Sequence, residues 1–314
     1  MAKQPSKPER RRETAGFFAR YCHLLIILIP LIVFSASVRN GFVYLDDDIL
    51  ILENQARITH LSETGKFFSS DAFLNNSSPY YRPMLNVSLM IDAQIGKTGA
   101  GFYHFMNLLL HLLCCMTLFG LLQRLGTGRE KAFAGAMVFA VHPIMASAVF
   151  WIPARSDLLV ALFGMLFFSA GIRYARDKKP VWLAASVLCF AMALFSKESA
   201  VLLPLLLLAW MILTRQKQLN MLALLAGPAA VIAGWFWLRS NAVTMIGAEQ
   251  LGFASIVKNA PFPFEIIARF FLPFILPVAP TFSTFFTTSG ILIALALPLF
   301  LLFRKGTGTS LFLF

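Results

Sequence analysis

The feature that most constrains this chain is a series of apolar runs of about 17 to 23 residues, separated by short charged clusters. Such a run is long enough for a helix to cross the roughly 30 Å hydrocarbon core of a bilayer. The composition agrees, because 58% of the 314 residues are apolar and 13% are charged, whereas about a quarter of an average soluble domain is charged. Because backbone polar groups within a bilayer must be satisfied inside each segment, the runs predict transmembrane helices and exclude a soluble fold.

Lysines and arginines fall mainly on one side of the predicted membrane. If Cys22–Val38 is the first span and starts in the cytosol, the cytosolic side carries 17 of the 27 Lys and Arg residues and 4 of the 15 acids. The positive-inside rule predicts this asymmetry, so we expect a cytoplasmic N-terminus. Although the net charge is +12, no basic stripe is interleaved with aromatic residues, and we expect no nucleic acid partner.

The predicted fold is all-α, a polytopic transmembrane bundle of about eight helices. The spans are Cys22–Val38, Tyr103–Leu122, Ala132–Trp151, Leu158–Ile172, Val181–Phe195, Ala200–Leu213, Met221–Leu238 and Gly290–Phe303. The last is short for a full span, and we expect it to begin upstream. The stretch Phe264–Pro280 contains Glu265, Arg269 and several prolines, which favours an interfacial or re-entrant helix on the outer face. A full crossing there remains the alternative.

The predicted topology divides the chain into a basic cytoplasmic tail over residues 1–21, in contact with anionic lipid, and a transmembrane module over residues 22–314. The module has a first extracytoplasmic loop over 39–102, long enough for a small structured subdomain, and a second large one over 239–288. The first span ends in Ser35-Ala36-Ser37, which suits a signal-peptide cleavage site. We predict that the span is retained, because the sidedness of the later loop charges depends on it. The four cysteines lie in or beside apolar spans and show neither a disulfide framework nor metal-ligand spacing.

Ionisable residues gather at the outer ends of the predicted helices. Asp46, Asp47 and Asp48 follow the first span, and neighbouring carboxylates suit a general base or a cation ligand. Alone, the triplet would fit a solvated acidic turn better than a site. Further charges stand in short outer turns that need none for solubility: Arg82, Arg155, Asp157, Lys197 and Glu198. Because short hairpins hold these groups near the membrane surface, we expect them to converge with the first loop.

Three histidines lie within the predicted spans. His142-Pro143 is about halfway along a span, where the proline should kink the helix. An imidazole at that depth faces the bundle or a water-filled cavity, and a packing role and a functional role stay equally open. His104 and His111 share one helix face with Asn107 between them, which we interpret as polar packing between helices.

Five groups of residues carry a family resemblance in their order and spacing. They are Gly41 to Asn54; Tyr81-Arg82-Pro83 with Leu85 and Asp92; Asn107 to His111; His142-Pro143 followed by Trp151, Arg155 and Asp157; and Ser196-Lys197-Glu198 through Pro204. This pattern resembles the membrane module of the transmembrane and tetratricopeptide-repeat O-mannosyltransferases and their bacterial relatives, which belong to the GT-C glycosyltransferase superfamily. The likeness is good from Gly41 to Pro204 and weak from Arg269 to Pro277.

The resemblance implies a GT-C-like bundle that takes a sugar from a polyprenyl- or dolichyl-phosphate donor and passes it to a protein or glycan hydroxyl, with inversion. It implies an aspartate base in the first outer loop, and we favour Asp47 over Asp46 and Asp48. The leaving lipid phosphate needs cations rather than an acid. The expected phosphate-binding residues are Arg82, Arg155, Lys197 and Arg269, supported by Tyr81, His142, Asp157 and Glu198. The resemblance implies no certain cofactor, and a divalent cation stays open. The site would be extracytoplasmic, in a bacterial inner membrane or, in a eukaryote, in the endoplasmic reticulum membrane.

Two departures separate the chain from the family pattern. The relatives usually carry a second His and a Glu after His142-Pro143, where this chain has Met145 and Ser147, so any contribution of that pair to binding a metal or an acceptor is lost and the metal stays open. No tetratricopeptide array follows before Phe314, which fits either a compact member or an incomplete chain.

Two other functions stay open. A transporter or flippase would use buried polar residues such as His142 along a substrate path. Ionisable residues crowd one face of the predicted bundle, however, and no internal repeat is visible. A non-catalytic relative that acts as an assembly factor is the other alternative, and the altered segment after His142 favours it.

Overall fold

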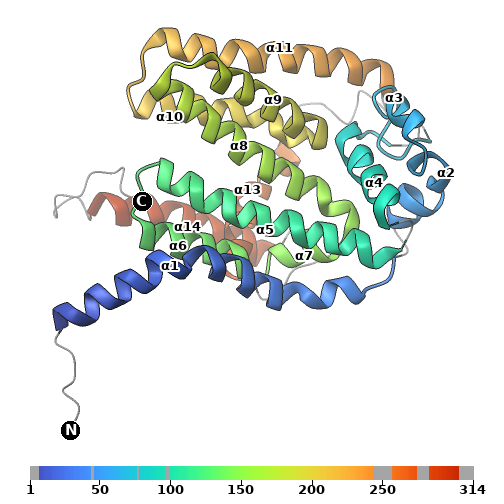
Figure 1. Cartoon of the computed structure of the whole chain (residues 1–314). Helices are drawn as coiled ribbons and strands as arrows, with labels where there is room; N and C mark the ends of the chain where they lie inside the picture. Colours follow the sequence, from blue (N-terminus) through green and yellow to red (C-terminus); the bar gives the residue numbers. More distant parts are fainter. Residues whose placement is uncertain are drawn as a thin grey trace. The chain divides into compact units, whose positions relative to one another are not determined.

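The computed structural model describes residues 7–43, 46–75, 78–96, 99–243, 257–273 and 283–303. Every regular element within these ranges is helical (Figure 1), which confirms the all-α prediction. The chain divides into two compact units. The first unit is Met1–Val141 with Ser147–Thr244, and the second is His142–Ala146 with Met245–Phe314.

Membrane-length helices account for much of the described part. Four helical stretches are long and apolar enough to cross a bilayer: Arg20–Arg39, Ala100–Arg124, Ile152–Asp177 and Asn220–Ala242. They correspond to α1 (Lys7–Phe34) with η1 (Ser35–Arg39), α5 (Ala100–Arg124), η4 (Ile152–Ala154) with α8 (Arg155–Asp177), and α11 (Gln218–Ala242). Shorter apolar helices are α9 (Pro180–Ser196), η5 (Glu198–Leu202) with α10 (Leu203–Leu213), and the first part of α14 (Thr284–Phe303). The polytopic prediction is therefore confirmed.

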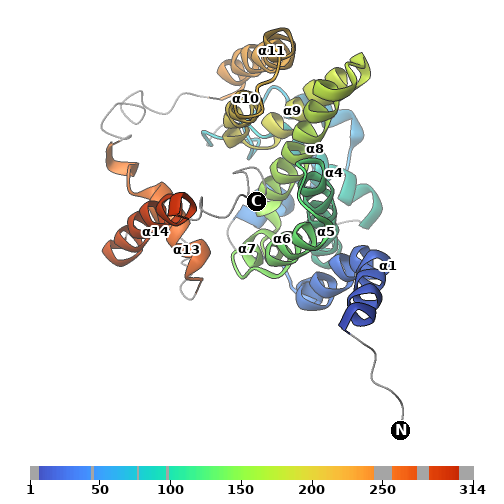
Figure 2. The same cartoon turned by 90° about the vertical axis from the view of Figure 1, so that its left-hand side faces the viewer.

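Helix α8 occupies the centre of the first unit and packs against both α5 and α9 (Figures 1 and 2). Of its most apolar window, 56% is buried, whereas only 17% of the corresponding window of α11 is buried. Helix α5 also packs against α1 and against α6 (Arg129–Val141), and α9 packs against α11. This difference in burial places α8 in the core and leaves α11 with a largely exposed apolar surface that suits lipid.

The predicted span Ala132–Trp151 is not one continuous helix. Helix α6 ends at Val141, and α7 (Met145–Phe150) begins after a turn at His142-Pro143. Proline has no N–H to donate and disfavours helical backbone at the residue before it. The kink expected at Pro143 is therefore a complete break, and neither piece alone has the length of a span.

The segment after η1 folds into short helices that stand at one end of the long ones. These are η2 (Asp48–Leu52), α2 (Gln55–Ile58), η3 (Leu61–Glu63), α3 (Thr64–Phe67) and the longer α4 (Pro83–Gly96). They enclose an apolar cluster that includes Ile51, Ile58 and Leu89, and Tyr103 of α5 and Ile152 of η4 belong to the same cluster. Shared packing thus fixes this segment onto the ends of α5 and η4.

Helices α13 (Phe262–Phe271) and α14 pack against each other in the second unit. Ten residues make a helix of about 15 Å, half the thickness of the hydrocarbon core. The remaining residues of the predicted stretch, 274–280, lie outside the described part. Helix α14 begins at Thr284, upstream of Gly290 as expected.

Candidate active site

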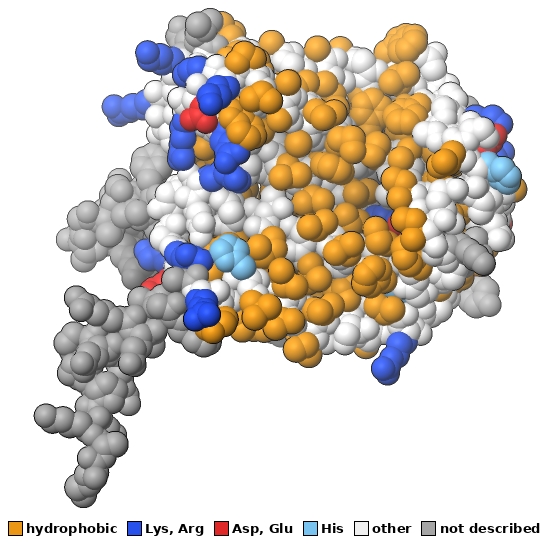
Figure 3. Space-filling view, in the orientation of Figure 1, with side chains coloured by type: hydrophobic (Ala, Val, Ile, Leu, Met, Phe, Trp, Pro, Cys, Tyr) orange, Lys and Arg blue, Asp and Glu red, His pale blue; other side chains and the backbone are white. Residues whose placement is uncertain are grey.

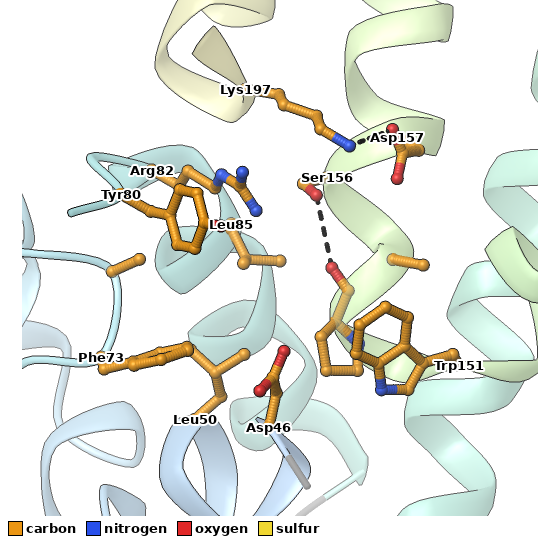
Figure 4. A pocket seen from close by; sticks show the side chains of 13 residues that line it. Asp46, Leu50, Phe73, Tyr80, Arg82, Leu85, Trp151, Ser156, Asp157 and Lys197 are labelled. Atoms are coloured by element: carbon orange, nitrogen blue, oxygen red, sulfur yellow. Dashed lines mark hydrogen bonds and ion pairs between the residues drawn. The ribbon is translucent and has the colours of Figure 1, made fainter. Parts of the chain in front are cut away.

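A cavity of about 80 Å³ lies where the short helices meet the start of α8 (Figure 4). On the scale in which one water needs about 10–15 Å³, this volume holds several waters or one phosphate group. Its polar lining comes from segments far apart in the sequence, and aromatic rings complete the wall. The lining includes Asp46, Phe73, Tyr80, Arg82, Trp151, Ser156, Asp157 and Lys197.

Of the three consecutive aspartates, Asp46 lines this cavity, and its carboxylate points into it (Figure 4). Asp47 is fully buried, and its Oδ2 accepts a hydrogen bond of 2.8 Å from the backbone N–H of Val43. Burial raises the pKa of Asp47, although that hydrogen bond and the nearby His104 oppose the shift. Asp48 begins η2. Residues 46–48 are helical, so successive side chains are rotated by about 100° and cannot share one direction. Asp46 therefore lines the cavity, and Asp47 does not.

The first turns of α5 hold the backbone that leads to Asp46. The His104 ring donates from Nε2 to the Gly41 carbonyl over 3.2 Å, and Tyr103 packs on Phe42 with ring centroids 6.2 Å apart. Gly101 lets the chain approach closely, because a Cβ there would lie 2.8 Å from the Val38 carbonyl oxygen. His111 contacts the Ala140 carbonyl of α6 at 2.9 Å, in line with the predicted polar packing between helices, whereas His104 contacts the non-helical segment at Gly41.

Arg82 and Lys197 are the cations of the cavity. Arg82 donates from Nε to Glu198 over 3.0 Å, and its guanidinium lies 4.3 Å from the centre of the Tyr80 ring. Glu198 also accepts the backbone N–H of Tyr81 over 3.0 Å, so one carboxylate fixes both the side chain and the backbone at this point. The Tyr81 side chain is buried, and its hydroxyl donates to Phe68. It supports the turn without lining the cavity.

Lys197 pairs with Asp157 over 2.5 Å across the cavity wall (Figure 4). Both side chains keep contact with solvent, with 27% of Lys197 and 49% of Asp157 exposed. An ion pair this exposed is worth about 0–1 kcal/mol. Lys197 can therefore exchange Asp157 for another anion at little cost.

The position of Arg155 differs from the sequence expectation. Its side chain is 1% exposed and forms a buried ion pair with Asp92 of α4. It also donates to Asn107 Oδ1 over 2.7 Å and to the Tyr103 carbonyl over 2.8 Å. With its donors engaged inside the protein, Arg155 has no face for a lipid phosphate. The network ties α4, α5 and the first residue of α8 together, and this holds the neighbouring Ser156 and Asp157 at the cavity.

Arg269 and His142 belong to the second unit. Arg269 donates to Glu265 over 3.1 Å and lies over the Phe286 ring at 4.5 Å. His142 uses both ring nitrogens, since Nε2 donates to the Phe270 carbonyl over 2.8 Å and Nδ1 accepts from Ile144 N–H over 3.2 Å. The ring also stacks on Phe270 with centroids 4.6 Å apart. These contacts describe a packing role for His142, the first of its two open alternatives.

The described residues offer little for a metal ion. No group of three or more His, Cys, Asp or Glu side chains gathers in this part of the chain. Asp46 and Asp157 both line the cavity, but Asp157 is paired with Lys197. A cation between them would have too few protein oxygen ligands for a dedicated site.

Sequence reasoning missed Tyr80, Phe73 and Ser156 as lining residues. Tyr80 is next to the noted Tyr81-Arg82-Pro83 and Ser156 is next to Arg155, so a neighbouring motif could have suggested both. In the sequence, Trp151 was part of the family pattern after His142-Pro143 but had no predicted role in the site. The Trp151 residue lines the cavity, while its indole Nε1 is buried and has no hydrogen-bond partner among the described residues.

Residues 82–237 match the family of dolichyl-phosphate-mannose-protein mannosyltransferases. This stretch includes Arg82, Trp151, Asp157 and Lys197 of the cavity. Together with the membrane-length helices, the match defines the class: an integral membrane protein that resembles the GT-C-type O-mannosyltransferases. The resemblance inferred from the sequence is thereby confirmed.

Among curated proteins, the chain is similar to mouse protein O-mannosyl-transferase TMTC4, with 27% identity over 208 residues, 58% of this chain and 28% of the relative. Human protein O-mannosyl-transferase TMTC3 is 26% identical over 189 residues, 56% of this chain and 20% of the relative. The Caenorhabditis elegans protein O-mannosyl-transferase F38B6.6 is 25% identical over 150 residues, 45% and 21% of the two chains. The matched region thus spans less than a third of each relative. No solved structure matches the chain significantly.

Proposed function

We propose that the chain is a membrane glycosyltransferase that moves a sugar from a polyprenyl- or dolichyl-phosphate donor to a hydroxyl group of a protein or glycan. One arrangement carries the proposal: a carboxylate, Asp46, and two cations, Arg82 and Lys197, line a single cavity although they come from three separate segments. The similarity to dolichyl-phosphate-mannose-protein mannosyltransferases supports the donor class.

The geometry suits a direct displacement. Asp46 accepts the proton of the acceptor hydroxyl, whose oxygen forms a bond to the anomeric carbon of the sugar. The bond from that carbon to the phosphate oxygen breaks, and the lipid phosphate leaves with the electron pair, stabilised by Arg82 and Lys197. In Figure 4, Asp46 and the two cations lie on opposite sides of the cavity. Attack and departure on opposite sides invert the configuration of the carbon.

The two cations have different roles in this scheme. Glu198 holds Arg82 rigidly, and the planar guanidinium still has other N–H groups to donate to phosphate oxygens. Lys197 acts as a point charge that exchanges Asp157 for the donor phosphate. The cavity volume of about 80 Å³ fits the phosphate, and the sugar and the lipid chain extend beyond it.

The charge distribution supports an extracytoplasmic site with a cytoplasmic N-terminus. The cavity lies at the start of α8, and the Lys- and Arg-rich turn 173–179 lies at its other end. The membrane would be the bacterial inner membrane, or the endoplasmic reticulum membrane in a eukaryote.

The test is a transfer assay with purified full chain reconstituted in lipid vesicles. Radiolabelled polyprenyl-phosphate mannose and polyprenyl-phosphate glucose serve as donors, and donor consumption and labelled product are measured. We expect Asp46→Asn to lower kcat by about 10²- to 10⁴-fold, the usual contribution of a general base. Arg82→Gln and Lys197→Gln should raise the KM for the donor and also lower kcat, because the same cations bind the donor phosphate and stabilise the charge that develops as it leaves.

Asp48→Asn is the matched control, because it removes the same charge from the same turn. Equal losses in Asp46→Asn and Asp48→Asn would refute Asp46 as the base. A product that keeps the anomeric configuration of the donor would refute direct displacement. If the wild-type chain consumed no donor, the transferase proposal would give way to one of its alternatives. Movement of the lipid-linked sugar across the vesicle without hydrolysis or transfer would identify a flippase.

A further inference from the structure

Three arginines gather at the opposite end of α8 from the cavity. Arg124 is the last residue of α5, and Arg173 and Arg176 lie in the last two turns of α8. Each contact crosses between the two helices: Arg124 Nη1 donates to Ser169 Oγ over 3.0 Å, and Arg176 Nη2 donates to the Arg124 carbonyl over 2.6 Å. The two helices therefore end side by side with their cations intermixed.

Asp177, the residue after Arg176, brings one carboxylate close to this cluster without forming an ion pair with it among the described residues. None of the ion pairs between described residues includes Arg124, Arg173 or Arg176. Their known partners are a hydroxyl, a backbone carbonyl and an aromatic ring, since the Arg173 guanidinium lies 4.2 Å from the centre of the Trp182 ring. The negative end of a helix dipole attracts about one cation at each helix end. The two helix ends and Asp177 offset only part of the three positive charges, so a further anion would stabilise the cluster.

The cluster lies at the depth of lipid headgroups. Asp157 at the cavity and Arg173 are 16 residues apart on α8, a rise of about 24 Å, which is close to the thickness of the hydrocarbon core. Trp182 is an aromatic residue of the kind enriched at membrane interfaces. Arg124 and Arg173 are half-buried and Arg176 is exposed, so an anion can reach all three. Figure 3 shows a group made mostly of Lys and Arg side chains, with an acidic side chain among them, at its upper left, beside a broad apolar surface.

We propose that Arg124, Arg173 and Arg176 form a binding site for the phosphodiester headgroup of an anionic phospholipid, in the leaflet opposite the cavity. Guanidinium groups bind phosphate oxygens in pairs, and the apolar helix surface beside the cluster suits acyl chains. Basic pockets between transmembrane helices are known to hold anionic headgroups. This site is separate from the proposed transferase chemistry and does not depend on it.

The experiment measures lipid binding to the purified full chain in phosphatidylcholine nanodiscs. Fluorescent phosphatidylglycerol is titrated as a minor component, and energy transfer from tryptophan reports its proximity. Each cation near the surface contributes about fivefold to anionic lipid affinity. We therefore expect Arg173→Gln/Arg176→Gln to weaken binding about 25-fold, with thermal stability in pure phosphatidylcholine little changed.

Lys178→Gln/Lys179→Gln is the matched control, because it removes two charges at the same membrane surface outside the cluster. We expect it to weaken binding less than Arg173→Gln/Arg176→Gln does, because these lysines add to the surface potential but do not contact the bound headgroup. Equal effects of the two double variants would overturn the site and leave only a general surface potential. Displacement of the lipid by millimolar inorganic phosphate would show that the cluster binds a free anion, and this would refute a phospholipid as its ligand. If Arg173→Gln/Arg176→Gln does not fold, Arg173→Lys/Arg176→Lys takes its place, because it keeps the charge and loses the paired hydrogen-bond geometry. Unchanged affinity of Arg173→Lys/Arg176→Lys for phosphatidylglycerol would overturn the proposed site.

Discussion

Separating the buried partners Asp92 and Arg155 should destabilise the first unit strongly. Both side chains are 1% exposed, and a buried charge that loses its partner costs about 3–5 kcal/mol. In Asp92→Asn the guanidinium keeps Asn107 Oδ1 and the Tyr103 carbonyl as acceptors but has no counter-charge, so we expect a loss of about 3 kcal/mol. In Arg155→Met the remaining carboxylate can bind a proton, and this neutralisation limits the cost.

The pH dependence separates the two variants. Burial raises the pKa of Asp92 to about 6, although Arg155 opposes the shift. Removing Arg155 raises this pKa further. Because the folded state then binds the proton more tightly than the unfolded state, stability is retained at low pH and lost as the pH rises through the folded pKa. Arg155→Met should therefore be markedly more stable at pH 5 than at pH 8, whereas Asp92→Asn should lack this dependence.

The assay is unfolding in detergent micelles followed by helical circular dichroism at several pH values. Glu63→Gln is the control, because it breaks the ion pair with Lys66, whose side chain is 67% exposed, and should cost less than about 1 kcal/mol. The double variant Asp92→Asn/Arg155→Met should cost less than the sum of its parts, since neither partner is then left charged and alone. A loss below about 1 kcal/mol in Asp92→Asn, or strictly additive costs, would refute the buried pair as a structural tie.

Three further outcomes follow from the cavity and its surroundings. Burial raises the pKa of Asp47, so the folded state loses stability as the pH rises through the folded pKa. Asp47→Asn should therefore unfold at a higher temperature than the wild type at pH 7. At a pH below the ordinary Asp pKa of about 3.9, the two proteins should unfold at the same temperature. His104→Ala removes the donor to the Gly41 carbonyl and should lower kcat by about tenfold to a hundredfold by displacing Asp46, while His104→Gln, which can still donate, should keep most of the activity. Asp157→Asn releases Lys197 from a largely exposed pair and should lower the donor KM by up to about fivefold with little change in stability, as donor titrations and melting curves would show.

The helices were predictable because a membrane leaves few choices. Runs of apolar residues predicted α5, α8, α9 and α11 to within a few residues, since a helix that satisfies its own backbone is the solution available in lipid. The same reasoning predicted a kink at Pro143 in the span Ala132–Trp151. It did not show that the helix stops at Val141 and starts again at Met145, because a proline that kinks a helix and one that ends it have the same local sequence.

The site was predictable in composition and less so in its inner arrangement. The sequence placed Arg82, Asp157 and Lys197 near one surface, and the cavity contains all three. It could not separate Asp46 from Asp47, because which of two adjacent carboxylates faces a cavity depends on how residues 41–43 dock on α5. Arg155 and Asp157 lie in one turn, and only their neighbours in space distinguish a buried structural charge from a cavity-lining one.

The position of Arg155 bears on how the cavity keeps its charge pattern. A binding site for a phosphate donor needs accessible cations and a surrounding structure that stays rigid when an anion binds. Arg155 supplies this rigidity, because its carboxylate partner Asp92 and its neutral acceptors are all inside the protein. Lys197 supplies accessibility, because its partner Asp157 is half exposed and weakly held. The two residues could not exchange these roles. A buried Lys197 could not reach the proposed donor. An exposed Arg155 would no longer fix the position of the start of α8 and of Asp157.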